Sequence, residues 1–278
     1  MQLYALTHTT PISATRAEKR KDYKCPECGA TVRLRSGPSK QPHFYHLSAP
    51  KHCRQHTKSL EHLQLQLKLV TLLTPLDAQI ESPFPSINRI ADVAWHSKKI
   101  VFEIQCSPIS LEEAKERTLD YASLGYQVIW ILHDKRFNKK TLSAAESYLR
   151  TTPCYFTNSD KTGSGIVYDQ FETLSGARRT FKGPPLPLIP TNIFPLPTIA
   201  APDLDLPAII LQRLSQWKCY TEGDLLHHLL KEGNLSQTAK RLLALETKRQ
   251  KTKRLPLKIL IAKSYRALLE HMLSTLAG

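Results

Sequence analysis

The sequence lacks any run of about 18 apolar residues, the length that a membrane-spanning helix requires, which argues against a helical membrane protein. Its first residues also lack a basic segment followed by an apolar stretch, so we expect no secretory signal. The 6 cysteines are then expected to be metal ligands or buried thiols rather than disulfides. We predict a cytoplasmic protein with no membrane partner.

Acidic residues are also scarce, with 24 Asp and Glu against 39 Lys and Arg. The formal net charge of +15 is unevenly distributed: residues 1–56 carry +7, residues 57–134 carry −3, residues 135–207 carry +3 and residues 208–278 carry +8. An acidic segment between basic ends suits a polyanion that is held by the flanks and processed in the middle. This layout predicts a nucleic acid as the partner.

Two apolar strands joined by a tight reversal are predicted within the acidic segment, over residues 89–95 and 100–105. A loop formed by residues 97–98, or by residues 96–99, places residue 103 opposite residue 92. A three-residue loop would shift this register and separate the two positions.

In that register Asp92 and Glu103 are cross-strand neighbours, with Cβ atoms about 5 Å apart. Two facing carboxylates repel each other, and a divalent cation between them would remove this cost. The alternative is that each acid is a solvated surface group. Gln105 shares the face of Glu103, because strand side chains repeat every two residues.

A largely buried helix is predicted over residues 57–74, where its leucines follow helical spacing and Pro75 ends it. Glu61 in its first turns is either a structural acid with a partner or a third carboxylate beside the metal.

A second helix begins at a capping box, Ser110 to Glu113, and ends at Gly125. The apolar residues 127–132 then indicate a buried, parallel strand, and residues 164–168 a further short strand. The order helix, strand, strand, helix, strand predicts an α/β sandwich.

Cysteine and histidine are concentrated in the first 56 residues. Cys25 and Cys28 form a Cys-x2-Cys knuckle, and zinc prefers four nitrogen or sulfur ligands arranged as a tetrahedron. We favour His46 and Cys53 as the second pair, with His43 as a substitute for His46. The alternative is a related fold that has lost its metal, against which the intact knuckle argues.

Proline dominates residues 184–207, with 8 among 24 residues, which excludes a packed helix or a central strand there and favours a semi-rigid linker. Beyond it we predict basic helices. A dense positive stretch there is either a solvated loop or a patch that contacts phosphates. The predicted helices span residues 206–217, 221–231, 236–246 and 257–276, and the positive stretch spans residues 248–254.

Together these motifs resemble the CoiA-type competence proteins of the PD-(D/E)xK nuclease superfamily. The resemblance covers roughly residues 1–135 and does not extend clearly to the basic C-terminal part. It rests on Cys-Pro-x-Cys at 25–28, His-Phe-x-His at 43–46, Ser-x-Glu-His at 59–62, Arg-x-Ala-Asp-Val at 89–93, Glu-x-Gln-Cys-Ser at 103–107 and Arg-x3-Tyr at 117–121.

The resemblance implies a restriction-endonuclease-like α/β core. The residues outside this core predict a small N-terminal zinc-binding module and a basic α-helical C-terminal region. The domains would be a zinc-finger-like module at 1–56, a nuclease-like domain at 57–183, a proline-rich linker at 184–207 and a helical domain at 208–278.

The resemblance also implies a metal-dependent phosphodiesterase site. Asp92 and Glu103 would bind Mg²⁺ or Mn²⁺, together with Glu61 from the preceding helix. Gln105 stands where the superfamily usually has a lysine. Arg117 and Tyr121 would contact DNA or buttress the site.

The favoured hypothesis is a Mg²⁺-dependent deoxyribonuclease that processes DNA in competence and recombination. The second is a catalytically weak or inactive DNA-binding scaffold with a nuclease fold, which the glutamine at 105 favours. The third is an adaptor whose C-terminal helices bind another protein of DNA metabolism. The sequence sets neither the oligomeric state nor the choice between endonuclease and exonuclease.

Overall fold

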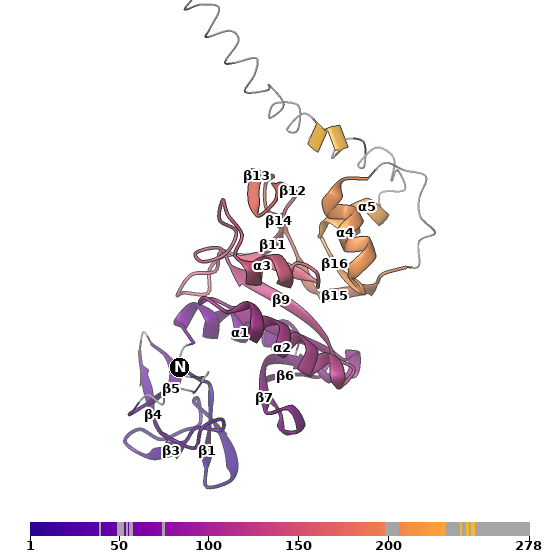
Figure 1. Ribbon diagram of the computed structural model, residues 1–278. Coiled ribbons are helices and arrows are strands. Elements are labelled where there is room, and N and C mark those ends of the chain that lie inside the picture. The colour runs from indigo at the N-terminus through magenta and orange to yellow at the C-terminus, as the bar shows by residue number, and fades with distance from the viewer. Residues whose placement is uncertain are drawn as a thin grey trace, which may run out of the picture.

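The computed structural model describes residues 1–38, 40–48, 53, 55, 58–73, 76–197 and 206–231, with isolated positions from 240 to 247. Figure 1 shows the N-terminal strands gathered at one end of the molecule, α1 and α2 across its middle, and the β12–β13 hairpin toward the other end. Within this described part, no helix is both long and apolar enough to cross a membrane.

The N-terminal module is a sheet with the order β2-β1-β3-β4-β5. All of its pairs are antiparallel. Its small core includes Tyr23, Phe44 and the two thiols Cys25 and Cys53. The strands are β1 (Tyr4–Thr7), β2 (Thr10–Ser13), β3 (Asp22–Lys24), β4 (Thr31–Gly37) and β5 (Lys40–His46).

The central sheet has seven strands in the order β14-β11-β10-β9-β8-β7-β6. The middle strands β8, β9 and β10 run parallel, and the outer pairs are antiparallel. The predicted α/β class is therefore present as a mixed α/β fold with a large mixed sheet. Its strands are β6 (Ala78–Phe84), β7 (Arg89–Trp95), β8 (Ile100–Gln105), β9 (Gln127–His133), β10 (Cys154–Thr157), β11 (Val167–Asp169) and β14 (Leu186–Pro187).

Helices cover both faces of this sheet. On one face, Leu63 and Leu69 of α1 share a core cluster with Ile131 of β9. On the other face, Tyr121 of α2 shares a second cluster with Trp130, the neighbour of Ile131 in β9. Because β9 is buried on both faces, it reads as a continuous apolar run, as the sequence predicted. The helices are α1 (Leu60–Leu73), α2 (Leu111–Ser123) and α3 (Ala144–Leu149).

The predicted hairpin between β7 and β8 has the register that a four-residue loop gives. Val93 pairs with Phe102 and Trp95 with Ile100, with residues 96–99 as the connection. Lys99 closes the loop at φ 53°, in the left-handed region. The capping box is also present, since the Ser110 hydroxyl accepts a hydrogen bond from the amide of Glu113, which fixes the start of α2.

The proline-rich segment differs from the linker that the sequence predicted. Part of it forms β14 at the edge of the central sheet, and β15 (Ile189–Pro195) pairs with β16 (Cys219–Glu222) as a separate ribbon. Proline is tolerated in these strands because an edge leaves the missing N–H without an obligatory partner. A further hairpin joins β12 (Glu172–Ser175) and β13 (Arg178–Lys182).

The C-terminal described residues form α4 (Ala208–Gln216) and α5 (Leu225–Lys231). Residues 221–222, predicted as the start of the helix over 221–231, belong to β16 instead, because Cys219 and Thr221 are buried where this strand pairs with β15. Ile210 of α4 belongs to the same core cluster as α1, so this part packs on the central sheet. The predicted helix at 257–276 and the basic stretch at 248–254 lie outside the described residues, as does most of 236–246.

Buried polar contacts fix that packing. Arg213 of α4 forms an ion pair with Asp169 of β11, with 2.7 Å between Nη2 and Oδ1. Asp169 also accepts a hydrogen bond from the amide of Leu225 at 3.0 Å, and the hydroxyl of Tyr155 donates to Asp224 at 2.7 Å. Burial raises the pKa of Asp224 to about 6, and the neighbouring Asp169 adds to the rise.

Candidate functional site

Asp92 lies at the point where the ladder between β7 and β8 ends. Its Oδ2 accepts a hydrogen bond from the amide of Ile104 at 2.8 Å, so the carboxylate takes a bond that a backbone carbonyl would otherwise take. From α1, His62 Nε2 lies 2.9 Å and Gln66 Nε2 lies 3.0 Å from Oδ1 of Asp92. Only 3% of Asp92 is exposed, so this carboxylate is almost fully withdrawn from water.

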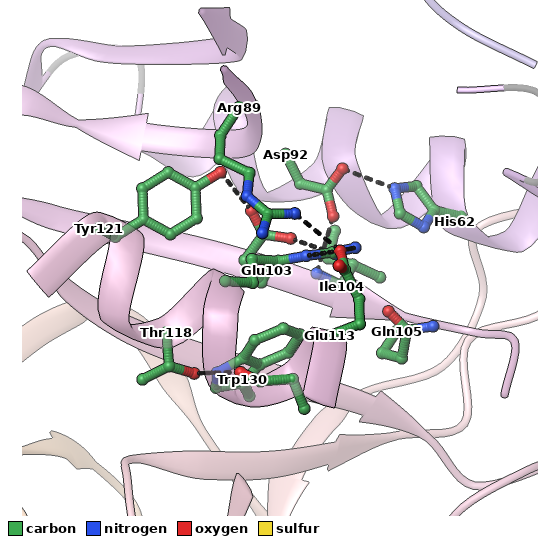
Figure 2. A network of polar contacts seen from close by, with 12 residues as sticks. His62, Arg89, Asp92, Glu103, Ile104, Gln105, Glu113, Thr118, Tyr121 and Trp130 are labelled. Carbon is green, nitrogen blue, oxygen red and sulfur yellow. Dashed lines mark hydrogen bonds and ion pairs between the residues drawn. The ribbon is translucent and has the colours of Figure 1, made fainter. Parts of the chain in front are cut away.

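Glu103 is held from the other helix. Its Oε1 accepts a hydrogen bond from the hydroxyl of Tyr121 at 2.8 Å, and its Oε2 lies 2.9 Å from Nη1 of Arg117. Figure 2 shows Tyr121 directed at Glu103, with Asp92 directed at His62 on the other side of the same group. Arg117 and Tyr121 are four residues apart and therefore share one face of α2. They buttress the carboxylate of Glu103.

Arg117 is in turn held by a second carboxylate, that of Glu113. Glu113 Oε1 accepts from Arg117 Nη2 at 2.8 Å and from Arg89 Nη1 at 2.8 Å. Arg89 also donates to Asp120 through Nε at 2.7 Å. This chain of charge-assisted bonds ties the start of β7 to α2 and sets the orientation of Arg117.

A lysine that sequence reasoning missed lies beside Asp92. Lys58 Nζ is 3.0 Å from Asp92 Oδ1 and 3.2 Å from Glu81 Oε1, and its side chain is only 8% exposed. Burial alone would lower the pKa of Lys58, but the two carboxylates raise it above its ordinary value, so the ammonium stays charged. Its signal in the sequence is weak, because it lies just before α1 and belongs to none of the motifs described above.

The two acids of the site differ in their electrostatics. Burial by itself would raise the pKa of Asp92, but His62 and Lys58 outweigh it and hold that pKa below its ordinary value. Burial raises the pKa of Glu103; Arg117 opposes the rise, and the negative charge of Asp92 adds to it. The two carboxylates are thus close enough to repel each other, as the predicted register requires.

Both acids open onto one pocket of about 310 Å³. Gln105 lines the same pocket, and its amide donates to the carbonyl of Ser107 at 2.8 Å. Figure 2 places Gln105 at the margin of the group, apart from the bonds between Asp92 and His62. The predicted residues Asp92, Glu103, Gln105, Arg117 and Tyr121 all line this pocket.

Glu61 does not join them. Its Oε1 lies 3.0 Å from Nζ of Lys135, and Glu61 is absent from the described residues that line the pocket. Successive positions on a helix diverge by about 100°, so His62 reaches Asp92 while Glu61 points elsewhere. The expected convergence of three acids is therefore replaced by a pair, and the structure favours the alternative in which Glu61 is a structural acid with a partner.

The predicted cysteine and histidine ligands do converge. Cys25, Cys28, His46 and Cys53 offer ligand atoms that all lie within 4.8 Å of one another, and no other such group of three or more is found among the described residues. Cys25 Sγ and Cys53 Sγ are 3.7 Å apart, and Cys28 Sγ lies 3.4 Å from His46 Nε2. Sulfur ligands of tetrahedral zinc, each about 2.3 Å from the metal, have a similar separation. This Cys3His cluster could hold a zinc ion.

His43, the predicted substitute, is not part of this cluster. Its Nδ1 lies 2.8 Å from the carbonyl oxygen of Gln41. Burial raises the pKa of Cys53, and the neighbouring Cys25 adds to the rise, so thiolates at these positions require a nearby cation. A metal ion bound by these residues would therefore displace the protons of the thiols.

The Cys3His cluster and the acid pocket are linked through Glu27, between the two cysteines of the knuckle. Its Oε2 accepts from the amide of Gln55 at 3.0 Å and from the thiol of Cys53 at 3.4 Å. Glu27 and Gln55 both line the acid pocket. The N-terminal module thereby forms one wall of the pocket and positions the segment that carries Lys58.

Comparison with known proteins gives matches to two family models. Residues 58–173 match the family model described as the competence protein CoiA, nuclease-like domain, so the class is a nuclease-like α/β protein. Residues 6–56 match the model described as the competence protein CoiA, N-terminal domain. The chain belongs to the CoiA competence protein family, as the resemblance of its motifs predicted. No curated protein and no solved structure gives a match.

Proposed function

We propose that the chain is a metal-dependent DNA phosphodiesterase with a restriction-endonuclease-like core, acting on DNA in competence and recombination. One observation carries this proposal: Asp92 and Glu103, from neighbouring strands, share a pocket of about 310 Å³. The match to a nuclease-like domain over residues 58–173 supports it.

The donor set of the pocket fits Mg²⁺ or Mn²⁺. Both ions prefer hard oxygen ligands, which the carboxylates of Asp92 and Glu103 provide, and the pocket leaves volume for water and a phosphate. When bound there, such an ion supplies a water nucleophile at neutral pH and stabilises charge on the scissile phosphate.

Other residues of the chain position the two carboxylates and supply positive charge. Arg117 and Tyr121 hold the carboxylate of Glu103 in place, and the amide of Ile104 with His62 holds that of Asp92. Lys58 brings a positive charge to the pocket that Gln105 does not. We propose that its ammonium takes the place of the usual superfamily lysine and stabilises the phosphate as its charge increases.

The test is a cleavage assay on linear, circular and single-stranded DNA, with Mg²⁺ or Mn²⁺ and with EDTA as the control. We expect metal-dependent loss of at least one substrate. Intact DNA in all three forms at high enzyme concentration would contradict the proposal.

One observation favours a DNA-binding scaffold instead. Both carboxylates already have cationic partners, Lys58 for Asp92 and Arg117 for Glu103. If the chain is such a scaffold, we expect it to bind DNA without cleaving it in the assay above. Its affinity for DNA should then not change when Asp92 is replaced.

Lys58 gives a first prediction. Lys58→Met removes the ammonium and keeps most of the side-chain length, and we expect cleavage to fall by about 10²-fold. Affinity for Mn²⁺ should hold or rise, because the lysine no longer competes for Asp92. Lys68→Met, on the helix α1 that follows Lys58, is the matched control. Loss of Mn²⁺ binding together with cleavage would mean that Lys58 serves only to hold the fold.

Gln105 gives a second prediction. Gln105→Lys adds the usual superfamily charge and should keep or raise cleavage, whereas Gln105→Met, of similar size without charge, should not raise it. Introducing Gln105→Lys into Lys58→Met should restore part of the lost rate, because the two positions line one pocket. A complete loss of activity in folded Gln105→Lys would show that the glutamine has a more particular role.

A further inference from the structure

A second hollow, of about 650 Å³, lies outside the acid pocket and is strongly basic. Its positive residues come from the turn after β9 and from β13, and Asp134 is the one acid among its described lining residues. The basic residues are Lys135, Lys139, Lys140, Arg179 and Lys182.

This hollow and the acid pocket lie at the same edge of the central sheet, the one at which the carboxyl ends of β8 and β9 meet. β8 and β9 are parallel, with Gln105 beside Leu132, so the chain leaves both strands at one edge. The residues that follow β8, such as Ser107, line the acid pocket, and those that follow β9, such as Asp134, line the hollow. A strand of nucleic acid that leaves the pocket along this edge would reach the hollow next.

The charges of the hollow are not all engaged within the protein. Arg179 is buried and bound to Glu146, and Lys182 Nζ donates to the carbonyl of Asn138 at 3.1 Å. Lys139 and Lys140 are exposed to solvent. These two ammonium groups are therefore placed to contact the phosphates of a polyanion.

Aromatic side chains accompany the lysines. Phe181 lines the hollow and is only partly buried, with its ring centroid 6.2 Å from that of Phe171. Tyr168 lines it as well. A base can stack on such a ring only when it is unpaired, because the bases of a duplex are already stacked on one another.

We propose that this hollow binds an unpaired stretch of the DNA strand whose scissile phosphate lies in the acid pocket. The proposal rests on the proposed function for the identity of the strand, while its binding surface stands on the lysines and the aromatic ring. Lys139 and Lys140 bind phosphates, and Phe181 stacks on a base.

The test measures binding apart from cleavage. A fluorescent single-stranded oligonucleotide and the matching duplex are titrated with the zinc-loaded full chain, without Mg²⁺ or Mn²⁺, over a series of salt concentrations. The variant Lys139→Gln/Lys140→Gln should bind the single strand about tenfold more weakly. Its slope of log K against log salt should be smaller by about 1.4, because two phosphates are no longer neutralised by the protein.

Two further variants separate charge from stacking. Phe181→Leu should weaken single-strand binding by about tenfold and leave the salt slope unchanged, because no charge is removed. Lys19→Gln/Lys21→Gln removes two exposed charges from the N-terminal module and should change binding much less. Wild-type affinity for the single strand in both Lys139→Gln/Lys140→Gln and Phe181→Leu would overturn the proposal. An equal loss of affinity for duplex and single strand would overturn it as well.

Hydrolysis of bis(p-nitrophenyl) phosphate distinguishes this proposal from the proposed function. This small diester needs the acid pocket and not the hollow, so the double lysine variant should hydrolyse it at the wild-type rate. If the wild-type chain hydrolyses neither DNA nor the small diester while the lysine and Phe181 variants still lose single-strand binding, the catalytic proposal fails and the hollow stands.

Discussion

Replacing Asp92 with asparagine is expected to lower metal-dependent DNA cleavage on the order of 10³-fold, equivalent to about 4 kcal/mol of transition-state stabilisation. The substitution keeps the size of the side chain and removes its charge, which is the feature that a divalent cation requires. Cleavage of a labelled linear duplex under single-turnover conditions measures the effect. Glu103→Gln should have an effect of the same order, because the two acids act on the same ion.

Asp120→Asn is the matched control for Asp92→Asn. Asp120 accepts a hydrogen bond from the buried Arg89, as Asp92 does from the buried Lys58, but it is not among the described residues that line the acid pocket. It should retain most activity. Thermal unfolding must accompany each assay, because Asp92→Asn leaves Lys58 with one carboxylate partner fewer. Folded Asp92→Asn that cleaves at the wild-type rate would contradict the proposed role of this acid.

Removing the metal from the Cys3His cluster is expected to unfold the N-terminal module. Structural zinc contributes about 10 kcal/mol or more to the folding of small domains, and five short strands with a core of few residues have little else to offset its loss. The purified chain should contain one zinc per molecule by elemental analysis. Cys28→Ser should lower the zinc content and the unfolding temperature of this module.

Cleavage should fall with the zinc, because Glu27 and Gln55 line the acid pocket and are bonded to each other beside Cys53. Cys154→Ser serves as the control for the loss of a thiol outside the cluster, since Cys154 is buried in the core between α2 and the central sheet. It should lose some stability and keep its zinc. Freshly purified, unchelated protein without zinc would rule out the structural role.

The register of the β7–β8 hairpin could be predicted because loop length and alternation fix it together. Loops over residues 97–98 and over residues 96–99 both place Val93 opposite Phe102, so the neighbourhood of Asp92 and Glu103 follows from local rules once a three-residue loop is excluded. The same is true of β9, whose apolar run reflects burial on both faces. The Cys3His ligands were predicted from the knuckle and the requirement for a tetrahedron.

Glu61 and Lys58 show where such reasoning ends. The rotation of α1 about its own axis decides whether Glu61 or His62 faces Asp92, and this rotation is set by packing of its leucines against the sheet. Lys58 reaches Asp92 because the segment before α1 is held near the N-terminal module, a tertiary contact without a local signal. The strands β14 and β15 in the proline-rich segment were missed for a related reason, since their partners, β11 and β16, lie outside that segment.

We propose that Asp92 and Glu103 hold a divalent cation between them. Diffraction from crystals soaked in Mn²⁺, with data at the manganese absorption edge, locates such an ion directly. We expect an anomalous peak in the acid pocket, within bonding distance of both carboxylates, that is lost in Asp92→Asn. Well-ordered carboxylates that keep Lys58 and Arg117 as partners at saturating Mn²⁺, with no peak between them, would contradict it.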